Sequence, residues 1–66
     1  MLLARQGDMR GAIAAFERTQ TMRPENADAR RGLAEAYTAL GAELTAAGRL
    51  TEATDAFARG AAAAPQ

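Results

Sequence analysis

The sequence predicts an all-α fold, and three observations support this. Nineteen of the 66 residues are alanine, which has the highest helix propensity. Valine is absent and Ile13 is the one aliphatic β-branched residue, so the side chains that favour strands are almost missing. Between separated glycine and proline residues, apolar residues recur with helical spacing. A chain of this length predicts one domain, residues 1–66.

The first of three main helices is expected over residues 9–22. Asp8 can cap its N-terminus, directly after a turn at Gly7 that would set apart a short stub over residues 1–6. One apolar face follows at i, i+4 and i+7, formed by Met9, Ile13 and Phe16. Pro24 then prevents the helix from continuing.

The second helix is expected over residues 27–46 and the third over residues 50–63. Asn26 is a suitable N-cap for the second helix, and a turn at Gly48 ends it. Its apolar stripe recurs every three or four residues and consists of Leu33, Tyr37, Leu40 and Leu44. The third helix is expected to bury Leu50, Ala53 and Phe57.

The third helix repeats the first with a displacement of 41 residues. The matched pairs are Leu3 with Leu44, Gly7 with Gly48, Met9 with Leu50, Ala12 with Ala53, Ala15 with Ala56, Phe16 with Phe57, and Pro24 with Pro65. These are expected turn and core positions rather than surface positions. The pattern is therefore typical of a structural repeat, in which each unit buries the same face against its neighbour.

The same residues resemble the tetratricopeptide repeat, whose spacing is W-x2-L-G-x2-Y, then A-x3-F, then P. The chain has Tyr37-x2-Leu40-Gly41-x2-Leu44, then Ala53-x3-Phe57, then Pro65. The resemblance implies a partial first repeat over residues 1–26 and a second repeat over residues 27–66. The chain departs from the family because its units are displaced by 41 residues rather than the usual ~34.

The additional residues fall at positions 27–33 and lengthen the first helix of the second repeat by about two turns. A heptad rotates a helix face by only ~20°, so one long helix keeps its apolar stripe aligned with its neighbours. We favour this unbroken helix, because Gly41 fits a small-residue position of the repeat and costs only ~1 kcal/mol inside a helix. The alternative reads the same motif one heptad earlier, with a break at Gly41.

The residue types argue against several functions. Without cysteine, histidine or lysine there is no thiol nucleophile, imidazole base or Schiff-base amine, so we expect no enzyme, cofactor or metal site. Eight basic residues balance eight acidic ones, which removes the positive field that nucleic-acid binding needs. No stretch is long and apolar enough for a signal peptide or a membrane span, so we expect no membrane partner and favour a cytoplasmic location.

The resemblance implies a protein–protein interaction scaffold whose groove holds a peptide or a partner helix. The positions that line the groove in the family correspond here to Arg31, Glu35, Thr38, Ala39, Ala42 and Thr45. The alternative function is self-assembly, in which incomplete repeats are completed by another copy of the chain. On that ground we also expect a homo-oligomer.

Overall fold

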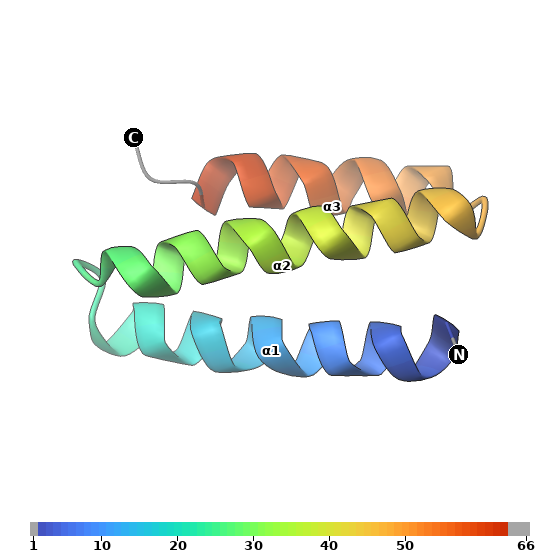
Figure 1. Cartoon of the computed structure of the whole chain (residues 1–66). Coiled ribbons are helices and arrows are strands. Elements are labelled where there is room, and N and C mark those ends of the chain that lie inside the picture. The colour runs from blue at the N-terminus through green and yellow to red at the C-terminus, as the bar shows by residue number, and fades with distance from the viewer. Residues whose placement is uncertain (1, 64–66) are drawn as a thin grey trace.

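The computed structural model consists of three consecutive α-helices, with no strand among residues 2–63, which are the residues it describes; side chains are described for residues 7–63. The helices are α1 (Leu2–Met22), α2 (Ala27–Ala46) and α3 (Leu50–Ala63), each antiparallel to the one before it (Figure 1). The all-α fold and the expected bounds of α2 and α3 are confirmed. The side chain of Leu3 and the whole of Pro65, both part of the expected repeat, lie outside the described residues.

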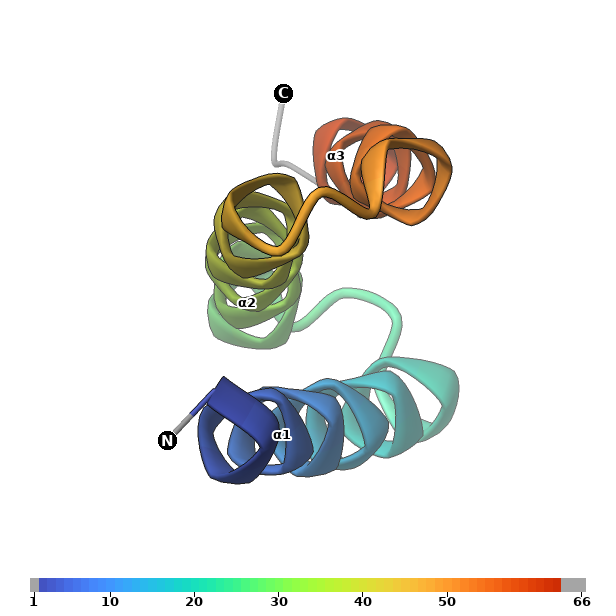
Figure 2. The ribbon, with the colours of Figure 1, turned by 90° about the vertical axis from the view of Figure 1, so that its right-hand side faces the viewer.

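The central helix is α2. The other two helices pack against different sides of α2, so the three helix axes form a V in cross-section (Figure 2). Within residues 2–63, α1 and α3 do not approach each other closely. Because α2 continues unbroken through Gly41, the expected long helix is confirmed and the alternative break at Gly41 is wrong.

The start of α1 differs from the expectation, because the helix begins at Leu2 rather than at residue 9. It passes through Gly7 and Asp8, so the turn at Gly7, the separate stub and the Asp8 cap are wrong. One interior glycine costs only ~1 kcal/mol, whereas each residue added to an existing helix contributes a further backbone hydrogen bond. The leucine, alanine, arginine and glutamine residues before Gly7 are also good helix formers.

The ends of α2 follow the expected signals. Gly48 has a φ of 80°, in the left-handed region that glycine adopts without strain. There the Arg49 N–H donates to the Leu44 carbonyl at 2.8 Å, which ends the helix. At the N-terminus of α2 the Ala29 N–H donates to Oδ1 of Asn26 at 3.1 Å, so the Asn26 cap is confirmed.

The hydrophobic core lies along the two seams that α2 forms with its neighbours. Its buried members are Ile13, Leu33, Leu40, Leu44, Ala53 and Ala56. The expected burial of Leu50 and Phe57 is wrong, because these side chains are 63% and 42% exposed. In Figure 2, α3 has a neighbouring helix on one side only. Part of its wide apolar stripe therefore stays exposed.

Two phenylalanine rings pack directly against glycines of α2. A Cβ atom placed on Gly32 would lie 2.5 Å from Cζ of Phe16, and one placed on Gly41 would lie 2.7 Å from Cε1 of Phe57. Non-bonded carbon atoms are comfortable only at ~3.5–4.0 Å, so each ring occupies space that a side chain would need. The missing side chains therefore let α1 and α3 pack closely against α2.

We predict that Gly32→Ala lowers the free energy of unfolding by ~1–3 kcal/mol, because the Phe16 ring must leave its position against α2. Gly11→Ala in α1 is the matched control, since a Cβ atom there would meet nothing within 4 Å. That substitution should raise the free energy of unfolding by ~0.5–1 kcal/mol through helix propensity alone. Urea unfolding followed by circular dichroism measures both changes. Equal stabilisation by the two substitutions would show that Phe16 does not pack on Gly32.

Candidate functional site

The residues expected to bind a partner all lie on α2. All six are exposed: Arg31, Glu35, Thr38, Ala39, Ala42 and Thr45. Four of them, together with Ala34, line a shallow recess with a volume of about 390 Å³, and these four are Glu35, Thr38, Ala39 and Ala42. Arg31 and Thr45 belong to the same helix but not to the lining of this recess. We call this surface the α2 recess.

The α2 recess is mostly apolar. Glu35 is the one charged side chain in its lining. The Thr38 hydroxyl donates to the Ala34 carbonyl at 2.8 Å, and the Thr45 hydroxyl donates to the Gly41 carbonyl at 2.8 Å. Because their protons are already used within α2, both threonines can only accept a hydrogen bond from a partner and otherwise present a methyl group. A partner would therefore meet small apolar side chains, with one carboxylate beside them.

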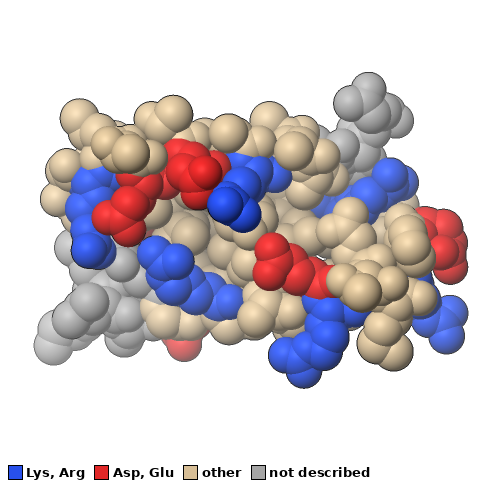
Figure 3. Space-filling view, turned by 180° about the vertical axis from the view of Figure 1, so that it is seen from behind, with Lys and Arg blue, Asp and Glu red and all other residues tan. Residues whose placement is uncertain are grey.

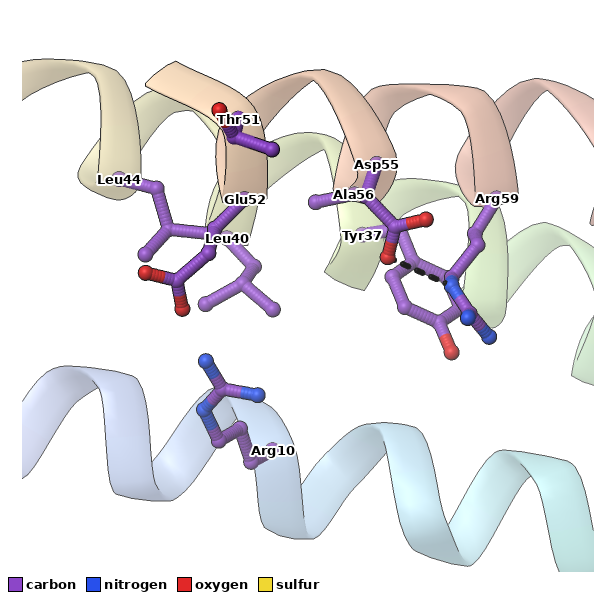
Figure 4. Close-up of a pocket in the computed structure, with 9 residues that line it drawn as sticks. All are labelled: Arg10, Tyr37, Leu40, Leu44, Thr51, Glu52, Asp55, Ala56 and Arg59. Atoms are coloured by element: carbon purple, nitrogen blue, oxygen red, sulfur yellow. Dashed lines mark hydrogen bonds and ion pairs between the residues drawn. The ribbon is translucent and has the colours of Figure 1, made fainter. Parts of the chain in front are cut away.

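A second hollow lies on the opposite side of the molecule, between α1 and α3, and was not expected from the sequence. This cleft has a volume of about 540 Å³ and opens on the face shown in Figure 3, where acidic and basic side chains are interspersed. Its lining consists of Arg10, Tyr37, Leu40, Leu44, Thr51, Glu52, Asp55, Ala56 and Arg59 (Figure 4). The leucines of α2 form its floor, whereas Arg10 stands on the α1 wall and Glu52 on the α3 wall.

The acidic side chains of the cleft are paired with arginines of the same segment. Nε of Arg59 donates to Oδ2 of Asp55 at 2.8 Å, and Nε of Arg49 lies 3.0 Å from Oε1 of Glu52. The Asp55 carboxylate raises the pKa of the Arg59 guanidinium. These pairs follow the i, i+4 and i, i+3 spacing of neighbours on one helix, so the sequence contained the signal for them. Their exposure means that they add little to stability.

Tyr37 lies at one end of the cleft and connects all three helices. It was expected in the core, and its ring does pack against the core cluster, but its hydroxyl reaches the surface and donates to Oε2 of Glu17 in α1 at 2.9 Å. Burial raises the pKa of the Tyr37 hydroxyl, and the hydrogen bond to Glu17 and the negative charge of that carboxylate raise it further. The nearby Arg59 of α3 has the opposite effect and lowers this pKa. No sequence pattern could reveal the Tyr37–Glu17 pair, because twenty residues separate them.

Two further properties concern the described part of the chain. Within residues 2–63, none of the helices is both long enough and apolar enough to cross a lipid bilayer. Across the same residues, no three or more side chains of the types that bind metals are grouped where they could hold an ion.

Consecutive antiparallel helices packed side by side are the architecture of helical-repeat proteins, and the described part of the chain has this architecture. The chain belongs to the tetratricopeptide repeat family, because the family model described as Tetratricopeptide repeat matches residues 3–43. The match covers most of α1 and continues into α2, and it confirms the resemblance found in the sequence. Comparisons with curated proteins and with solved structures found no significant match.

Membership of this family indicates a general role. Tetratricopeptide repeats are protein–protein interaction scaffolds, and they are typically interaction modules rather than enzymes. The exposed, largely apolar face of α2 is compatible with that role.

We predict that Tyr37 titrates at a higher pH in the folded chain than in the unfolded chain. Because folding raises this pKa, the neutral phenol contributes stability below the unfolded pKa of ~10, and the contribution is lost as the pH rises through the folded pKa. Tyr37 is the one tyrosine and tryptophan is absent, so tyrosinate absorbance reports this group alone. A midpoint equal to that of the urea-unfolded chain would contradict the prediction. Tyr37→Phe should lower stability at neutral pH by ~0.5–1 kcal/mol and remove this alkaline loss.

Proposed function

We propose that the chain is a non-catalytic scaffold that binds an extended peptide or a helix of a partner protein in the α2 recess. In this proposal residues 1–26 form a partial first repeat and residues 27–66 a second repeat, so α2 is the helix that lines the groove. The observation that carries the proposal is the lining itself, in which Ala34, Ala39 and Ala42 form an exposed hollow on a helix otherwise packed between two neighbours. The family's general role in protein interaction also supports a binding function for the chain.

The chemistry of the recess restricts the partner. Small side chains allow a partner backbone or short aliphatic side chain to come close to the helix surface of α2. Glu35 would favour a cationic group at one edge of the bound segment. We therefore expect bound peptides to combine aliphatic residues with at least one lysine or arginine.

The test is selection of peptides from a displayed random library on the purified chain, followed by affinity measurements with each variant. Ala39→Arg and Ala42→Arg should each weaken the binding of selected peptides at least ~10-fold, because the long charged side chain fills the recess. Ala14→Arg, at an exposed position of α1, is the matched control and should leave the affinity unchanged. Arginine is a good helix former, so none of the three substitutions should reduce helicity.

The outcome depends on where the selected peptides bind. If they bind equally well to the Ala39→Arg, Ala42→Arg and Ala14→Arg variants, the α2 recess is not the binding site. Glu35→Gln provides a separate check, since it should weaken cationic peptides selectively and leave uncharged peptides unaffected.

A further inference from the structure

The side of α3 that carries Leu50 and Thr54 is exposed. We propose that this surface pairs with the same surface of a second copy of the chain, giving a two-fold symmetric dimer. Its residues are Leu50, Thr54, Phe57 and Ala61, which we call the outer face of α3. The proposal is independent of the α2 recess, because none of these four residues lines it.

The exposure of the outer face is unusual for its residue types. Leu50 is 63% exposed and Phe57 is 42% exposed. Few large hydrophobic residues are exposed in the described part of the chain, and these two are among them. They stand at i and i+7, so they lie two turns apart on one side of the helix. Thr54 and Ala61 continue the stripe, and the Thr54 hydroxyl already donates to the Leu50 carbonyl at 2.9 Å. The face therefore presents carbon atoms with few unsatisfied polar groups.

The charges of α3 lie elsewhere on the helix. Glu52, Asp55 and Arg59 all line the cleft between α1 and α3 (Figure 4). Ala58, which borders the outer face, is also exposed and uncharged. An apolar face bordered by charges on one edge is typical of a surface that packs against another protein element.

The sequence repeat shows what kind of element would cover this face. The residues of α1 that match it by the 41-residue displacement are Met9, Ile13, Phe16 and Gln20. In α1 these positions are covered, since Ile13 is only 6% exposed, Phe16 packs on Gly32 of α2, and Met9 and Gln20 are partly buried. In α3 the matching residues are all more exposed: Phe57 still contacts Gly41 of α2 with one side of its ring, whereas Leu50, Thr54 and Ala61 are exposed. The same pattern is therefore covered in α1 and largely uncovered in α3. We infer that the occupant is an α-helix.

Self-pairing follows from the symmetry and the charge of the face. A two-fold interface brings each residue near its own copy or a symmetric neighbour, so a face without charges meets no like charge there. Antiparallel pairing centred near Thr54 places Leu50 of one copy opposite Phe57 of the other, and the small Thr54 side chains allow an interaxial distance of ~8–10 Å. The chain has no net charge to oppose association.

The molar mass in solution, measured by light scattering over a wide concentration range, tests the dimer. We expect the intact chain to shift from monomer to dimer with rising concentration, and Leu50→Glu to stay monomeric at every concentration with unchanged helicity. Ala14→Glu and Ala39→Glu place the same charge on α1 and in the α2 recess, and both should still dimerise. An intact chain that remains monomeric, or a Leu50→Glu variant that still dimerises, would overturn the proposal.

A cysteine variant tests the geometry without depending on the effect of a buried charge. The chain contains no cysteine, so Thr54→Cys introduces a single thiol near the proposed two-fold axis. Under mild oxidation it should form a disulfide-linked dimer quickly, because the two thiols approach within the distance a disulfide needs. Ala39→Cys should cross-link far more slowly. Equal rates for the two variants would contradict the pairing of the outer faces of α3.

The same variants separate this proposal from the proposed function. Ala39→Arg should weaken peptide binding at least ~10-fold and retain the dimer, whereas Leu50→Glu should abolish the dimer and retain peptide binding. Loss of dimerisation in Ala39→Arg would instead place the self-association surface in the α2 recess and would refute pairing through α3.

Discussion

The packing of two phenylalanines against two glycines of α2 is the contact on which the rest of the structure depends. Gly32 receives Phe16 from α1, and Gly41 receives Phe57 from α3. The two glycines are nine residues apart, which at ~100° per residue places them on roughly opposite sides of the helix. Because α2 contacts one ring on each side, the two helices that carry these rings are held apart from each other. For this reason α1 and α3 flank α2 and leave a cleft between them rather than closing into a compact bundle.

The exposed surfaces follow from that arrangement. With its flanks occupied, α2 can offer a partner only the narrow strip opposite the cleft, and this strip holds the alanines of the α2 recess. The cleft exists because α1 and α3 are held apart, and Tyr37 spans one end of it through its hydrogen bond to Glu17. The outer face of α3 is open because α3 packs on a single neighbour. Each surface therefore results from packing around α2 rather than from a separate local feature.

Much of the fold could be predicted, because strong local signals mark α2 and α3. Asn26 caps the N-terminus of α2, and Gly48 ends the helix with its left-handed backbone, as expected. Within the apolar stripe, Leu33, Leu40 and Leu44 are buried, also as expected. Gly7 failed as a turn signal because a single glycine does not stop a helix that good helix formers precede. The residues of the α2 recess could be located from the family motif, whereas the cleft and the Tyr37–Glu17 pair depend on contacts between helices that periodicity does not specify.

The comparison of α1 with α3 shows what a sequence repeat does and does not determine. Ala15 of α1 is exposed, whereas its counterpart Ala56 is 3% exposed against α2. Conversely, Ile13 of α1 is buried, whereas its counterpart Thr54 is exposed. The faces that α2 covers in the two helices are therefore rotated relative to each other, and they share the phenylalanine, since Phe16 and Phe57 both contact α2. If copies of the chain stacked head to tail, α3 of one copy would lie against α1 of the next, with no helix like α2 between them. Pairing about a two-fold axis avoids this, because the outer face of α3 then meets only its own apolar residues.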